Sequence, residues 1–209
     1  MLVEHSVQEM LNELASAAPT PGGGSAAALA GALAAGLVSM VCNLTVGKRR
    51  YRSVEADMRS ILGQAESCRE RLTWLIQRDM EVYSTVMAAY RLPSTSSEER
   101  LSRQLAWQAA LQEAADVPLQ IAECCQNVVQ LATDAARMGN TWAVSDAGAA
   151  ASLALAGAQA ASLSIEVNVR SMEDGAAAEA FRSRIERILA EVGRLAHETH
   201  AIVEERMEA

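Results

Sequence analysis

Aromatic residues are scarce in this chain of 209 residues, which holds three tryptophans, three tyrosines and one phenylalanine. Prolines number four, and all of them lie outside the long periodic runs of apolar residues. Strands favour aromatic and β-branched residues, so the shortage of both argues against a β-rich fold. Half of the chain is still apolar, and alanine, the strongest helix former, supplies much of that share. The composition predicts a closely packed all-α protein.

An excess of basic charge is also missing. The 18 Lys and Arg residues are outnumbered by 26 Asp and Glu, which gives a formal net charge of −8. A general basic face for nucleic acid is therefore absent, and we expect no nucleic-acid partner. The N-terminus opens with Glu4 and Glu9 in an amphipathic pattern, so we expect no signal peptide.

The cysteines form no CxxC pair and show no metal-ligand spacing. They stand at positions 42, 68, 124 and 125. Such cysteines are typical of core thiols in a reducing compartment, so we predict a cytoplasmic protein.

One long apolar run covers residues 26–41 and invites comparison with a membrane span. A span needs about 20 apolar residues, whereas this run is mostly Ala and Gly and is interrupted by Ser39 and then Asn43. A buried helix explains the run better, and we expect no membrane partner.

Breaks at Gly and Pro residues divide the chain into helices. We predict one single domain over residues 1–209, a bundle of long helices in which two Ala/Gly-rich helices are buried. The expected helices cover residues 4–17, 25–46, 54–89, 98–115, 116–138, 146–166 and 176–207, with Pro118 starting the fifth.

The helix over 54–89 carries an apolar stripe with steps of three and four residues, as in a coiled coil. Asp79 takes the stripe position between Leu75 and Val82. A carboxylate on an apolar stripe is costly to bury unless it is paired or protonated, so Asp79 is a candidate acid or base. The alternatives are a buried ion pair with an arginine, or a local shift of the stripe that exposes Asp79. The length of the stripe also predicts a homodimer.

Lys48 is the only lysine among the 18 basic residues. A lysine can shift its pKa and transfer a proton, which arginine cannot do usefully. Lys48 is therefore a second candidate catalytic residue. The alternative is a cation that answers the dipole at a helix C-terminus.

Two loops precede the Ala-rich helices. Gly22, Gly23, Gly24 and Ser25 open the first of them, and free amides at a helix start attract anions or carbonyl groups. The alternative is a flexible turn in which Ser25 or Gly24 caps the helix.

The second loop runs from Gly139 to Gly148. Its candidate ligand contacts are Asn140, Ser145 and Asp146, and Asp146 could accept from paired N–H donors of a heterocycle. Ser145 or Asp146 could instead act only as the helix cap.

His197 and His200 lie three residues apart, with Glu204 one turn further on. They lie off the apolar stripe of the last helix, and HETH is not the HExxH zinc motif, so we expect solvated side chains and no metal site. A Ser-His-Asp or Cys-His arrangement cannot be argued either.

Four stretches resemble the formiminotetrahydrofolate cyclodeaminase and methenyltetrahydrofolate cyclohydrolase family, in the order in which they stand here. They are PTPGGGSAAALAGALAAGLVSMVCNLTVGKRRY (19–51), DMEVYSTVMAAYRLP (79–93), DVPLQIAECC (116–125) and GNTWAVSDAGAAASLA (139–154). Trp142 stands where a smaller residue is usual, and Ala149 where a valine is. None of the four stretches belongs to the formiminotransferase domain of the bifunctional animal enzymes, so we expect a stand-alone domain.

The resemblance implies an all-helical fold, a dimer or larger oligomer, a tetrahydrofolate substrate, and neither metal nor redox cofactor. Carried over by position, it implies a catalytic pair, Asp79 and Lys48. It also implies substrate-binding residues, namely Gly22, Gly23, Gly24, Ser25, Asn43, Asn140, Ser145 and Asp146.

Two activities follow from the resemblance. We favour hydrolysis of 5,10-methenyltetrahydrofolate to 10-formyltetrahydrofolate, because the stretches 39–43 and 116–119 look most like the stand-alone bacterial cyclohydrolases. The alternative is the cyclodeaminase reaction, which releases ammonia from formiminotetrahydrofolate. A non-enzymatic folate-binding or structural bundle predicts instead that Asp79 is ion-paired and that no pocket joins it to the Gly22 loop.

Overall fold

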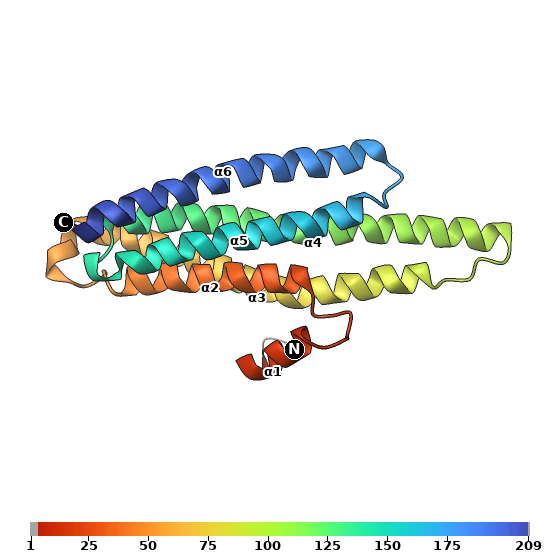
Figure 1. Cartoon of the computed structure of the whole chain (residues 1–209), viewed down its shortest axis with the longest axis horizontal. Helices are drawn as coiled ribbons and strands as arrows, with labels where there is room; N and C mark the ends of the chain where they lie inside the picture. The colour runs from red at the N-terminus through yellow and green to blue at the C-terminus, as the bar shows by residue number, and fades with distance from the viewer. Residues whose placement is uncertain (1–3, 209) are drawn as a thin grey trace.

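The computed structural model describes residues 4–208 as an all-α bundle, as the sequence predicts (Figure 1). Its α-helices are α1 (Val7–Leu14), α2 (Gly23–Asn43), α3 (Glu55–Tyr90), α4 (Ser97–Met138), α5 (Val144–Val169) and α6 (Gly175–Glu208). Two short 3-10 helices, η2 (Arg49–Val54) and η3 (Thr141–Ala143), precede α3 and α5. No strand occurs in the described part of the chain.

The two Ala/Gly-rich helices, α2 and α5, pack against each other inside the bundle. A Cβ atom on Gly157 would lie 3.0 Å from the Ala27 carbonyl oxygen, so glycine favours this close approach of the two backbones. Both helices are long and apolar enough to cross a membrane by length and composition. However, α2 packs against α3, α4 and α5, and this is the packing of a core helix.

Helix α3 confirms the predicted apolar stripe. Met58, Leu72 and Leu75 are fully buried, and Val82 is nearly so. Cys42 and Cys125 also lie in the core, where burial raises the pKa of each thiol to about 12. These two cysteines are therefore core residues, as predicted.

Helix α4 corrects one expectation, because it runs without a break where two helices were predicted on either side of residue 116. Pro118 lies inside it and has no N–H to offer the carbonyl of Ala114, four residues earlier. The side-chain amide of Asn168 on α5 donates to that carbonyl instead, at 2.7 Å. A tertiary contact thus supplies the hydrogen bond that the proline removes, and the helix continues.

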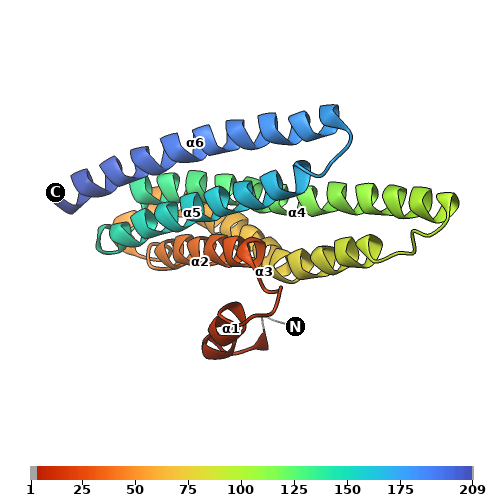
Figure 2. The ribbon, with the colours of Figure 1, turned by 45° about the vertical axis from the view of Figure 1, so that its right-hand side comes forward.

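The other helix bounds agree with the predictions to within a few residues, except that α1 is shorter than the predicted 4–17. Helix α1 has no fully buried residue and lies on the outside of the bundle, where the half-buried Met10 packs against the core (Figures 1 and 2). At one end of the bundle, α3 and α4 extend past the start of α2 (Figure 1). This overhang forms the walls of the site described next.

Candidate active site

Asp79 and Ser25 meet where α3 passes the first turn of α2. The Ser25 hydroxyl lies 2.9 Å from the Asp79 Oδ2 atom and 3.1 Å from the carbonyl oxygen of Ile76. Ser25 is fully buried and Asp79 is half-buried. Within residues 4–208 no Lys, Arg or His side chain forms a salt bridge with Asp79, so the ion pair that a non-enzymatic bundle predicts is not formed.

The glycine loop makes this approach possible. A Cβ atom on Gly24 would lie 2.0 Å from Asp79 Oδ1, whereas one on Gly23 would meet nothing within 4 Å. The N-cap of α2 is Gly22, which has no side chain to cap the helix, and Asp79 accepts from the main chain at Ser25. The expectation that Ser25 or Gly24 caps α2 is therefore wrong, because the Asp79 carboxylate on α3 accepts the hydrogen bond from the first turn of α2.

Burial raises the pKa of the Asp79 carboxyl, although its hydrogen bonds with Ser25 act in the opposite direction. A charged carboxylate loses hydration when it is half-buried, and no cation nearby compensates for that loss. The raised pKa makes Asp79 a candidate group to take up and release a proton.

A cavity of about 490 Å³ opens beside Asp79 and joins it to the glycine loop. Its floor is formed by Gly22, Gly23 and Gly24, and its walls come from α3, α4 and the last turns of α5. A non-enzymatic bundle predicts that no such pocket exists, so this observation also favours a working site. Small-molecule sites occupy about 300–1,000 Å³, so the cavity is large enough for a substrate.

Three aromatic side chains line the cavity, and the sequence analysis missed all of them. They are Tyr83 and Tyr90 on α3 and Trp107 on α4. The spacing of Tyr83 and Tyr90, seven residues apart on one helix, was the available signal. The partner Trp107 could not be found in this way, because only the pairing of α3 with α4 brings it there.

The second predicted loop lies at the opposite end of α2. The Asn140 side chain donates to the Leu44 carbonyl at 3.0 Å and accepts from the Tyr51 hydroxyl at 3.3 Å. The main-chain N–H of Asn140 donates to the Thr45 hydroxyl at 2.8 Å. Asn140 is buried, so its contacts hold the start of α5 against the end of α2.

Asn43, Lys48 and Ser145 are exposed near this second loop, and Asp146 is half-buried in the first turn of α5. Neither Ser145 nor Asp146 caps α5, whose N-cap is Ala143 without a side-chain hydrogen bond. The 21 residues of α2 separate this group from Asp79. At about 1.5 Å per residue, the separation is roughly 30 Å. One chain therefore does not bring Lys48 or Asp146 to Asp79.

The histidines of α6 form no site of their own. His197 and His200 are exposed, and His200 Nε2 lies 2.9 Å from the Ser152 hydroxyl. In the described residues, no group of three or more His, Cys, Asp or Glu side chains is placed to share a metal ion.

Comparison with known proteins agrees with this arrangement. A family model described as Formiminotransferase-cyclodeaminase matches residues 6–187. The chain is 43% identical to a protein named methenyltetrahydrofolate cyclohydrolase from Methylorubrum extorquens, over 99% of this chain and 100% of that protein. It is 32% identical to the rat formimidoyltransferase-cyclodeaminase over 91% of this chain, a match that covers 35% of the longer rat protein.

A solved structure shares the fold along its whole length. The crystal structure of formiminotetrahydrofolate cyclodeaminase from Thermotoga maritima superposes with a TM-score of 0.88, covers 98% of both chains and is 29% identical. The family match, the full-length relative and this superposition together show that the chain belongs to the formiminotransferase-cyclodeaminase family, in its cyclodeaminase part.

Proposed function

We propose that this protein hydrolyses 5,10-methenyltetrahydrofolate to 10-formyltetrahydrofolate. The observation that carries the proposal is the half-buried Asp79, held by Ser25 without an ion pair at the wall of a cavity of about 490 Å³. The relative that this chain matches from end to end carries the cyclohydrolase name, which favours this reaction.

The proposed reaction needs proton transfers around one carbon. Water adds to the cationic methenyl carbon between N5 and N10, and N5 then leaves. Asp79 as the carboxylate takes a proton from the water, and as the acid it returns a proton to the departing N5. The remaining hydroxyl proton passes to solvent as the carbonyl forms, so one proton is released overall. Since these steps need only proton transfer, we propose that no metal or redox cofactor takes part.

The cyclodeaminase reaction is the second candidate. In it, N10 attacks the formimino carbon and ammonia leaves, with similar proton transfers. It is favoured by the Thermotoga maritima structure and the animal relatives, which carry cyclodeaminase names. The match covers only about a third of the length of the animal relatives.

A homodimer would unite the two groups of site residues. From residue 26 to residue 40, every exposed or half-buried side chain of α2 is apolar: Ala26, Leu29, Ala30, Leu33, Gly36, Leu37 and Met40. If two copies pair antiparallel along this stripe, the end of one α2 lies beside the start of the other. The partner subunit's Lys48 and Asp146 then approach the Gly22–Ser25 loop and Asp79.

In this arrangement Lys48 is the electrostatic partner of Asp79 or the second proton carrier, and Asp146 binds the pterin edge. Asn43, Asn140 and Ser145 lie at the same end of the bundle as Asp146, and we propose that they also contact the pterin. We also propose a cytoplasmic location, which suits the four free thiols.

The decisive assay follows the near-ultraviolet absorbance of methenyltetrahydrofolate with the wild-type protein and with Asp79→Asn, and checks folding by circular dichroism. We expect rapid loss of absorbance with wild type and a loss of kcat of about 10²–10⁴-fold in the variant. Near-wild-type turnover by Asp79→Asn would refute the assignment. Ammonia release from formiminotetrahydrofolate identifies the cyclodeaminase instead.

A further inference from the structure

Nearly half of the aromatic side chains in this chain surround one cavity. The chain has seven aromatic residues, and Tyr83, Tyr90 and Trp107 line the cavity beside Asp79. Tyr83 and Tyr90 are 40% and 51% exposed, so they are not simply core residues. Aromatic faces that remain open in a cavity are suited to contact a flat ring of a ligand.

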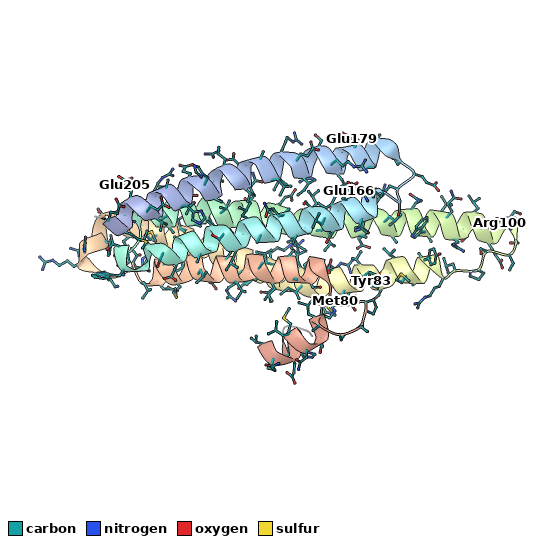
Figure 3. The ribbon with its side chains drawn as sticks, viewed as in Figure 1. Met80, Tyr83, Arg100, Glu166, Glu179 and Glu205 are labelled. Atoms are coloured by element: carbon teal, nitrogen blue, oxygen red, sulfur yellow. The ribbon has the colours of Figure 1, made fainter. Side chains whose placement is uncertain are left out.

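Tyr83 follows Asp79 by one helical turn on α3, whereas Tyr90 and Trp107 lie further from Asp79, toward the far tip of α3 and α4. Tyr90 is eleven residues beyond Asp79 on α3, or roughly 16 Å at about 1.5 Å per residue. Its ring meets that of Trp107 edge to face, with centroids 6.2 Å apart. Figure 3 shows Tyr83 on the same arm of the bundle as Arg100, which lies near the tip.

Two arginines, Arg100 and Arg103, lie close to this aromatic pair. The Arg103 guanidinium lies 5.0 Å from the Tyr90 ring centroid and donates to the Ser94 hydroxyl at 3.1 Å. Arg100 donates to the Thr95 carbonyl oxygen at 3.0 Å. Within residues 4–208 neither arginine pairs with a carboxylate, so most of their N–H donors are available to an anion.

A second hollow adjoins the first at Trp107. It has a volume of about 310 Å³ and is lined by Ser94, Arg100, Arg103, Gln104, Trp107 and Glu173. Trp107 belongs to both hollows. Glu173 is the acidic member and accepts from the Gln104 amide at 2.7 and 2.9 Å. The path from Asp79 is thus first apolar and aromatic, and then basic.

We propose that this path binds the p-aminobenzoylglutamate half of the substrate, with the aryl ring against Tyr90 and Trp107 and the carboxylates at Arg103 and Arg100. The inference rests on the proposed function, because it assigns a direction to the same substrate. The reacting carbon lies at Asp79, and the tail runs outward between α3 and α4. Guanidinium groups bind carboxylates with paired, charge-assisted hydrogen bonds, which suits this end of the path.

Arg49 and Arg50 are another pair of arginines that could attract the glutamate tail by charge alone. Both of those arginines precede α3, at the other end of the bundle from Tyr90. A tail that starts at Asp79 and enters the aromatic cavity runs away from them.

The test measures binding of p-aminobenzoyl-L-glutamate, without the pterin, by isothermal titration calorimetry. We expect Arg103→Gln to weaken binding about tenfold and Arg100→Gln by a smaller factor. Trp107→Ala also weakens binding, whereas Glu173→Gln strengthens it, because it removes a negative charge beside the carboxylates. Arg59→Gln is the matched control, since Arg59 pairs with Glu55 at the opposite end of α3.

The enzyme assay adds a second readout. Arg103→Gln should raise KM for methenyltetrahydrofolate with kcat nearly unchanged, because the tail does not take part in the chemical step. The proposal is overturned if Arg103→Gln binds the fragment as tightly as Arg59→Gln, or if wild type does not bind it. If binding depends on Arg103 while wild type turns over neither folate, the tail site stands and the proposed reaction fails.

Discussion

The Asp79 carboxylate accepts a hydrogen bond of 2.9 Å from the Ser25 hydroxyl, although the two residues are 54 positions apart in the chain. This contact joins the apolar stripe of α3 to the glycine loop before α2. Asp79 is therefore both the hydrogen-bond acceptor for the first turn of α2 and the candidate proton carrier. Replacements at this contact therefore test stability and catalysis together.

Asp79→Asn should stabilise the fold at neutral pH while it abolishes turnover. Burial raises the pKa of Asp79 in the folded state above its ordinary value of 3.8. The folded state therefore holds this proton more tightly than the unfolded chain, and the stabilisation from protonation is lost as pH rises through the folded pKa. We expect Asp79→Asn to melt at a higher temperature than wild type at pH 7.

The same difference in melting temperature should shrink as the pH falls below 3.8, where the carboxyl is protonated in both states. Thermal unfolding by circular dichroism over this pH range measures it. A difference that is constant with pH would show that the ionisation of Asp79 does not contribute.

Gly24→Ala should displace the Asp79 carboxylate, and Gly23→Ala should leave the carboxylate in place. The new Cβ atom at position 24 would lie 2.0 Å from Asp79 Oδ1, so the carboxylate must leave its place. The Cβ atom at position 23 meets nothing within 4 Å. We expect a loss of kcat of at least about tenfold for Gly24→Ala. Equal kcat values for the two variants would contradict this role of Gly24.

Asn168→Ala should destabilise the protein by about 1–3 kcal/mol, because it leaves the Ala114 carbonyl without its donor. The loss should be smaller in a Pro118→Ala background, where residue 118 regains an N–H for that carbonyl. Urea unfolding of the two single variants and the double variant measures the coupling between the sites. Strictly additive losses would show that Asn168 does not compensate for Pro118.

A mixture of Asp79→Asn and Lys48→Ala subunits should regain activity if the site is shared between two chains. Each mixed dimer then holds one site with both replacements and one intact site. After random reassortment, the expected activity is about a quarter of that of wild type. The absence of any regain, with mixed dimers verified by mass, would refute the shared site.

Local patterns determined the helices and several of the residues in them. Alanine content and apolar periodicity predict the all-α fold and the buried pair α2 and α5. The interrupted stripe singles out Asp79, because a lone carboxylate on an apolar helix face is visible in the spacing itself. The family resemblance of the stretch that contains Gly22–Ser25 indicates the same site, because Ser25 contacts Asp79.

Other features were decided only by tertiary contacts. Pro118 predicts a helix break, and the distant Asn168 amide removes the reason for one. Trp107 joins Tyr90 only because α3 and α4 pack side by side, and the length of α2 keeps Lys48 away from Asp79 within one chain. Sequence spacing reports which face of a helix a residue occupies. The residue that it meets depends on how separate helices pack, and this is a property of the whole folded chain.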